Sequence, residues 1–194
     1  LLLGFGGNAW NADAMAIMLH TMFPEHEIAA LHYRGYHPSS GRPSAKAIID
    51  DAHIGYDKVA RELDNGVVAI GFSIGASVAV ELAASRPVRG LVLVTPFDSL
   101  KELAATHYPW LPVRWLLRHQ LEAAATLRVL DVPVALITAQ NDTIVPKSRS
   151  QPVREAAQNL RADFEIEDTG HNDIYYNNKF ESALRHSVDS VLLR

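Results

Sequence analysis

The clearest chemical signal in the sequence is the five-residue stretch Gly71-Phe72-Ser73-Ile74-Gly75. The apolar run Val67–Ile70 precedes it, and the helix-forming run Ala76–Ala84 follows it. A strand, a sharp turn and a helix form the setting in which a serine hydroxyl is exposed as a nucleophile. We therefore predict that Ser73 is a nucleophile. In the alternative interpretation, Ser73 only caps the helix that follows it.

A nucleophilic serine needs a base that accepts its proton and an acid that orients the base. His171 follows the run Phe164–Asp168, and Asp142 follows the apolar run Val134–Thr138. Loops that leave the carboxyl ends of parallel strands open at the same edge of a sheet. We therefore predict that His171 is the general base and that Asp142 is the acid that orients it.

Each of these partners also has a simpler interpretation. Asp142 follows an asparagine, and Asn-Asp pairs favour ordinary turns. His171 is one of nine histidines, so it could be an ordinary loop residue. Asp168 and Asp173 flank His171 and are rival acids, although Asp173 fits better as a cap for the short stretch after it.

Hydrolysis at Ser73 would also need donors for the negative charge that develops on the substrate oxygen. The backbone N–H of Ile74, the residue after the nucleophile, is one expected donor. The second is expected from the loop after the first strand, and we choose Asn8 for it. Trp10 and Asn11, in the same loop, are predicted walls of the substrate pocket.

The elements that must position these residues alternate along the chain. Apolar, β-branched-rich runs predict strands at Leu1–Gly4, Glu27–His32, Val67–Gly71, Leu91–Thr95, Val134–Thr138 and Phe164–Asp168. Between them, helices are predicted at Ala12–Met22, Ser44–Leu63, Ile74–Ser85, Val153–Leu160 and from Phe180 to the end. This alternation predicts an α/β fold, with a doubly wound, mostly parallel sheet covered by helices on both faces.

One long segment interrupts the alternation. Phe97–Asp131 contains no strand candidate, but it gathers aromatic and aliphatic residues around two prolines. We predict a small helical cap over this range, inserted in a single domain that spans residues 1–194. Trp110 and Trp115 are predicted to line an apolar substrate pocket above Ser73. In the alternative interpretation, the segment packs on the edge of the sheet as a purely structural cap.

Composition narrows the possible functions. The 194 residues have a formal charge of −4 and no cluster of Lys and Arg, which argues against nucleic acid as a partner. The chain contains no cysteine, and its histidines follow no metal-ligand spacing, so we predict neither a metal nor a cofactor. No stretch approaches the roughly 20 apolar residues of a membrane span. We expect a cytoplasmic protein, with any segment before Leu1 and the oligomeric state left open.

Two other function classes compete with the hydrolase. The sequence Gly4-x-Gly6-x-x-Ala9 fits the dinucleotide fingerprint, and Arg34 could bind a 2′-phosphate, which would suit an NADP-dependent oxidoreductase. No acidic residue ends the second strand to hold a ribose, however. The other competitor is a catalytically silent binding module on the same fold, because a fold alone does not grant activity.

Further segments resemble the small α/β-hydrolases related to protein depalmitoylases, many of them described only as α/β-hydrolase domain-containing proteins. That family carries H-G-N-x-x-N, Y-R-G-Y-G-x-S-x-G-x-P, G-x-S-x-G, T/A-P-F-x-S and G-H-N-D motifs. The matching segments here are Gly6–Asn11, Tyr33–Pro43, Gly71–Gly75, Thr95–Ser99 and Gly170–Asp173. Gly6 stands where the family usually has histidine, His37-Pro38 replaces a glycine, and the family usually has further strands before this point. The resemblance implies hydrolysis of an acyl ester or thioester through an acyl-enzyme on Ser73, without a cofactor.

Overall fold

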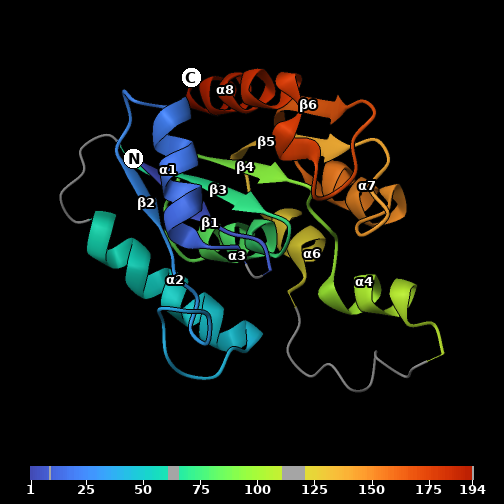
Figure 1. Ribbon diagram of the computed structural model, residues 1–194, viewed down its shortest axis with the longest axis horizontal. Helices are drawn as coiled ribbons and strands as arrows, with labels where there is room; N and C mark the ends of the chain where they lie inside the picture. The colour runs from blue at the N-terminus through green and yellow to red at the C-terminus, as the bar shows by residue number, and fades with distance from the viewer. Residues whose placement is uncertain (9, 61–65, 111–120, 194) are drawn as a thin grey trace.

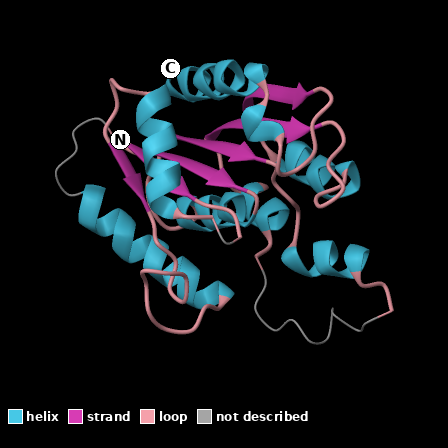
Figure 2. Ribbon diagram, viewed as in Figure 1, coloured by secondary structure: helices cyan, strands magenta, loops and turns pink. Residues whose placement is uncertain are grey.

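A computed structural model of the chain describes residues 1–8, 10–60, 66–110 and 121–193. Six parallel strands form one sheet in the order β2-β1-β3-β4-β5-β6 (Figures 1 and 2). The strands are β1 (Leu2–Phe5), β2 (Ile28–Ala30), β3 (Val68–Phe72), β4 (Gly90–Val94), β5 (Pro133–Ala139) and β6 (Asn159–Ile166). The predicted parallel sheet is therefore confirmed.

Helices cover both faces of this sheet, as Figure 1 shows. Helices α1 (Ala12–Met22) and α8 (Asn178–Leu192) pack on one face. On the other face, α3 contacts the sheet and both α2 and α6, and α6 in turn contacts α7. These helices are α2 (Ala45–Val59), α3 (Ile74–Ala83), α6 (Ala123–Leu127) and α7 (Lys147–Ala156). The doubly wound arrangement therefore holds.

The core lies in two layers, one on each side of the sheet. Along β3, Val68, Ile70 and Phe72 belong to the layer under α1 and α8, whereas Ala69 belongs to the opposite layer. This alternation follows from the two-residue period of a strand. All five residues of β3 are buried, which explains why its sequence is continuously apolar.

The two largest boundary errors lie next to each other. A helix was expected at Val153–Leu160, but α7 spans Lys147–Ala156 and β6 already begins at Asn159. Pro152 lies inside α7, where the missing N–H removes one hydrogen bond without ending the helix. Because β6 is an edge strand with alternating exposed polar residues, its first half lacks the apolar run that marked the other strands.

The expected cap at Phe97–Asp131 is described only in part. Helix α4 (Leu100–His107) begins the segment and α6 ends it, and residues 111–120 lie outside the described ranges. The end of the predicted helix at Leu63 lies outside them as well. Among the described helices, none has the length and apolar character needed to cross a membrane.

Candidate active site

Ser73 lies on a sharp turn between β3 and α3. Its φ of 53° and ψ of −116° place it in a region that residues other than glycine rarely adopt. Such backbone strain costs on the order of 1–3 kcal/mol and clusters at functional sites. The end of the neighbouring strand β4 holds the turn, since the Ser73 N–H donates to the Val94 carbonyl over 2.8 Å. The turn has the geometry that the Gly-x-Ser-x-Gly pattern predicts.

The two glycines of this turn permit close backbone packing. A Cβ on Gly75 would overlap the carbonyl oxygen of Phe5 at the end of β1. A Cβ on Gly71 would overlap the backbone of Gly75 and Ala76. Because both overlaps are with backbone rather than with mobile side chains, larger residues at these positions would displace the sharp turn that carries Ser73.

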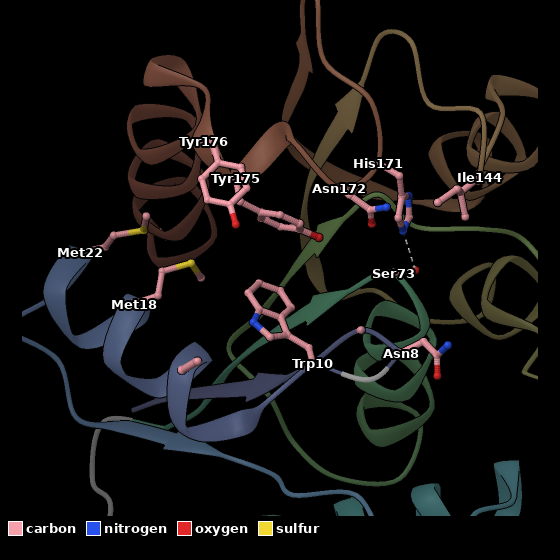
Figure 3. Close-up of a pocket in the computed structure, with 12 residues that line it drawn as sticks. Asn8, Trp10, Met18, Met22, Ser73, Ile144, His171, Asn172, Tyr175 and Tyr176 are labelled. Carbon is pink, nitrogen blue, oxygen red and sulfur yellow. Dashed lines mark hydrogen bonds between the residues drawn. The ribbon is translucent and has the colours of Figure 1, made fainter. Parts of the chain in front are cut away.

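The Ser73 side chain makes no capping hydrogen bond to α3. Its Oγ instead lies 3.0 Å from Nε2 of His171, as the dashed line in Figure 3 shows. The capping interpretation therefore does not describe this serine. This distance is that of a hydrogen bond between a hydroxyl and an imidazole.

Asp142 holds the other side of the His171 ring. Its Oδ2 lies 2.7 Å from Nδ1 of His171, and its Oδ1 accepts the N–H groups of Ile144 and Val145 over 2.9 and 2.7 Å. The Asp142 side chain is only 5% exposed and that of His171 10%. Because a carboxylate only accepts hydrogen bonds, this contact favours the tautomer with its hydrogen on Nδ1, which makes Nε2, the atom nearest Ser73 Oγ, an acceptor.

The rival acids have other positions. Oδ1 of Asp173 accepts the N–H of Gly170 over 2.6 Å, so this carboxylate shapes the loop that carries His171. It precedes the 3₁₀ turn η2 (Ile174–Tyr176), but its side chain makes no capping bond there. Asp168 is exposed and has a positive φ of 55°. In the structure, Asp142 is the carboxylate that contacts the ring of His171.

The loop after β1 passes beside Ser73. A Cβ added to Gly7 would lie 3.6 Å from the Ser73 Cβ, and both Gly7 and Asn8 line the pocket. Two tyrosines hold this loop in place: Tyr33 donates to the Gly6 carbonyl over 3.1 Å, and Tyr36 donates to Oδ1 of Asn8 over 2.7 Å. Burial raises the pKa of the Tyr33 phenol well above its usual range, so this residue remains a donor.

Ile74 is the first residue of α3. The N–H groups of a helix's first turn have no partner within the helix, and the helix dipole adds positive potential at that end. The Ile74 N–H belongs to this group and comes from the residue directly after Ser73. The contributions of Asn8 and Ile74 to an oxyanion hole remain predictions.

A cavity of about 610 Å³ opens at Ser73 (Figure 3). Its lining consists of Gly7, Asn8, Trp10, Ala14, Met18, Met22, Ser73, Ile144, His171, Asn172, Tyr175 and Tyr176. Trp10 lies in this wall, where its ring meets those of Phe72 and Tyr175, both at 4.8 Å between centroids. The volume lies within the range of small-molecule sites.

Two predicted wall residues lie elsewhere. Asn11 is the N-cap of α1, where its side chain accepts the N–H groups of Asp13 and Ala14 over 2.8 and 3.0 Å. Trp110, three residues after the end of α4, is 75% exposed and does not line the cavity. The other predicted tryptophan, Trp115, lies outside the described residues.

The sequence interpretation missed the opposite wall. Ala14, Met18 and Met22 stand four residues apart on α1, next to the stripe of Met15 and Leu19 that enters the core. Both stripes are apolar, so their composition does not separate a pocket wall from a core face. Burial raises the pKa of Tyr175, another wall residue, to about 12, with Asp142 as a further contributor.

Neither the fold nor the loop after β1 fits dinucleotide binding. The order β2-β1-β3-β4 differs from the 3-2-1-4-5-6 order of that fold, because β3 lies beside β1. The start of α1, which would have to hold a pyrophosphate, is occupied by the Asn11 side chain and followed by the acidic Asp13. Within the described ranges, no three His, Asp or Glu side chains form a group suited to a metal ion.

Two curated proteins resemble the chain in sequence. It is 35% identical over 173 residues to the uncharacterized protein Rv2307c of Mycobacterium tuberculosis, covering 88% of this chain and 61% of that protein. It is 25% identical over 177 residues to the mouse lysophosphatidylserine lipase ABHD12, covering 80% of this chain and 44% of that protein. The chain thus spans between about two fifths and three fifths of these relatives' lengths. A scan of protein-family models finds no match.

Solved structures show the fold directly. An alpha-beta hydrolase from Vibrio vulnificus superposes with a TM-score of 0.76 at 21% identity, over 98% of this chain and 73% of that one. The chain therefore has the α/β-hydrolase fold. In such open sheets, ligands bind where the strand order reverses, at the carboxyl ends of the strands. Here β1 and β3 flank that position, and the loops after them carry Gly7 and Ser73.

Proposed function

We propose that this α/β-hydrolase is a serine hydrolase that cleaves a carboxylic ester or thioester through an acyl-enzyme on Ser73. The observation that carries the proposal is the chain of contacts from Ser73 Oγ to His171 Nε2 at 3.0 Å and from His171 Nδ1 to Asp142 Oδ2 at 2.7 Å. The strained backbone at Ser73 and the cavity that opens there support the same assignment.

Acylation uses each of the three side chains. Ser73 Oγ attacks the substrate carbonyl carbon while its proton passes to Nε2 of His171. The buried Asp142 carboxylate stabilises the imidazolium that results. The tetrahedral intermediate then expels the alcohol or thiol, which takes the proton from His171 as the carbon–oxygen or carbon–sulfur bond breaks. The acyl group remains on Ser73 as an ester.

Deacylation repeats these steps with water. His171 takes a proton from a water molecule whose oxygen attacks the acyl carbon. The second tetrahedral intermediate releases the carboxylic acid and returns the proton to Ser73. Water is thus the only reactant that these two steps need besides the chain and the ester or thioester.

The negative oxygen of both intermediates needs preorganised donors. We assign these donors to the backbone N–H groups of Ile74 and Asn8, on either side of Ser73. The hydrogen bonds from Tyr33 to Gly6 and from Tyr36 to Asn8 hold the second side. Removing one such donor typically costs about 10²–10³ in kcat, so a fixed loop matters for the rate.

The names of related proteins agree with this chemistry. ABHD12 is named a lysophosphatidylserine lipase, which is an ester hydrolase, and the Vibrio vulnificus structure is named an alpha-beta hydrolase. Because the chain covers only 44% of ABHD12, the lipid named for that protein does not identify the substrate of this chain.

The test is the turnover of p-nitrophenyl acetate and of thiophenyl acetate by the wild type, Ser73→Ala and His171→Gln. Wild-type turnover of either compound with an initial burst, lost in both variants, is the expected result. Activity of the folded wild type on neither compound would instead favour a silent binding module. Turnover that survives Ser73→Ala would refute the assignment of the nucleophile.

A further inference from the structure

The cavity at Ser73 continues beyond the reacting groups along α1. Figure 3 shows Met18 and Met22 far from Ser73, with Trp10 and Tyr175 between them. Tyr176, which is 89% exposed, borders this side from η2. One continuous cavity therefore joins the nucleophile to a pair of methionines.

The wall between these two ends is firmly held. The Trp10 ring contacts both Phe72, which is fully buried, and Tyr175, which also packs against Phe180 at 5.4 Å. Aromatic contacts of this kind contribute about 0.5–1.5 kcal/mol each beyond simple burial. The path is thus a feature of the folded core rather than a gap between loose side chains.

The far half of the cavity carries no charge. Its walls are the rings of Trp10, Tyr175 and Tyr176 and the side chains of Met18 and Met22. Methionine is flexible and polarisable, so it packs well against chains of varying shape. An alkyl chain fits such walls, whereas a charged head group would lose its hydration there without gaining a partner.

We infer that this groove, which we call the methionine groove (Trp10, Met18, Met22, Tyr175, Tyr176), binds the acyl chain of the substrate and selects its length. The inference rests on the proposed function, because the chain is placed by its ester bond to Ser73. It places the acyl site along α1 rather than at Trp110, which is 75% exposed and outside the cavity.

The size of the cavity sets the preferred length. With about 30 Å³ for a water-sized group, a cavity of about 610 Å³ accommodates about 20 such groups. Part of this space lies at Ser73 and holds the ester, and the rest, toward Met18 and Met22, has room for a medium-length acyl chain. The substrate class is therefore esters or thioesters of medium-length fatty acids.

The position of His171 decides which half of the substrate enters the groove. His171 donates its proton to the leaving group, which must therefore lie on the imidazole side of Ser73. Figure 3 places Ile144 on the side of His171 away from Tyr175 and the methionines, and Ile144 is 41% exposed. The leaving group faces this open side, and the acyl chain faces the methionine groove.

The experiment is kcat/KM for p-nitrophenyl esters of two to twelve carbons, measured on the wild type and four variants. Met18→Trp and Met22→Trp fill the groove, and Met18→Ala enlarges it. Ile17→Trp is the matched control, because Ile17 is on the same helix but is 68% exposed and outside the cavity. Melting temperatures identify any variant that fails to fold.

The wild type is expected to gain up to about fourfold in kcat/KM for each methylene buried. Met18→Trp should lower the ratio of octanoate to acetate activity about tenfold or more, roughly the value of two buried methylenes. Met22→Trp should act mainly on decanoate and dodecanoate, and Met18→Ala should move the optimum to longer chains. Ile17→Trp should keep the wild-type profile.

Three results would overturn the inference. One is a wild-type profile that falls steadily beyond acetate, and another is the same profile in Met18→Trp and Ile17→Trp. The third comes from a parallel series of alkyl acetates: if Met18→Trp acts on the length of the alcohol instead, the groove holds the leaving group. In all three cases the enzyme still hydrolyses esters, whereas a wild type that hydrolyses none of them would refute the proposed function as well.

Discussion

Replacing Asp142 by asparagine changes one carboxylate oxygen to an amide nitrogen at the residue that orients His171. The structure determines which oxygen changes. Oδ1 accepts two N–H groups, from Ile144 and Val145, so the amide oxygen of the variant must remain at that position. The amide NH₂ is then forced to face Nδ1 of His171, which must accept a hydrogen instead of donating one.

The fixed orientation of this amide holds the His171 imidazole in the tautomer that cannot act as a base. With Nδ1 accepting, the hydrogen of His171 moves to Nε2, the atom that lies 3.0 Å from Ser73 Oγ. Nε2 can then no longer accept the serine proton. In a serine protease, the same exchange costs about 10⁴ in kcat. We expect a loss of this order here, equivalent to about 5 kcal/mol of transition-state stabilisation.

The assay is kcat/KM for p-nitrophenyl acetate together with a thermal melt. Asp168→Asn is the matched control, because it makes the same chemical change at an exposed residue three positions before His171. Asparagine tolerates the positive φ of 55° at that position. The reasoning would be refuted if the folded Asp142→Asn variant retained most of its activity, or if Asp168→Asn lost as much.

Two further predictions concern the tyrosines around the site. Tyr33→Phe leaves the Gly6 carbonyl without its 3.1 Å partner, and an unsatisfied buried acceptor costs about 1–3 kcal/mol, so urea unfolding should show a lower midpoint together with a lower kcat. Tyr36→Phe, which removes a more exposed bond to Asn8, should cost less, and an equal loss would argue against this account. Because burial raises the pKa of Tyr175 to about 12 from an ordinary value of 10.0, the neutral phenol favours the folded state. Its contribution, up to about 2–3 kcal/mol, should be present below pH 10 and decline between pH 10 and 12. Tyr175→Phe should make the fall in stability over this range less steep, and the buried Tyr33 phenol, whose pKa is also raised, keeps the remainder.

Much of the fold was predictable because the central strands are buried on both faces. Continuous apolar runs such as Val68–Phe72 and Gly90–Val94 are typical of parallel strands that helices cover on each side. The edge strand Asn159–Ile166 was only half predicted, since its outward residues are polar and exposed. Helix α7 was displaced by several residues because Pro152 lies inside it rather than before it.

The three loop residues Ser73, Asp142 and His171 could be grouped from their positions after strands, because parallel strands open at one edge. The residues of the cavity wall on α1 could not be predicted in this way. Met18 belongs to a stripe that faces the site, whereas Met15 one turn earlier faces the core, and only the angle of α1 to the sheet distinguishes them. The prediction for Trp110 failed because an apolar residue in an apolar segment was expected to be buried in the pocket wall. In the structure it is 75% exposed.

The central claim, that Ser73 is an activated nucleophile, is tested most directly by covalent labelling. A fluorophosphonate reacts only with a serine whose proton is taken by a neighbouring base, and the product is identified by intact mass and by sequencing the labelled peptide. We predict one adduct per chain, on Ser73, that is absent from Ser73→Ala and reduced by orders of magnitude in His171→Gln. An adduct on any other residue, or labelling that persists in folded Ser73→Ala, would contradict the account.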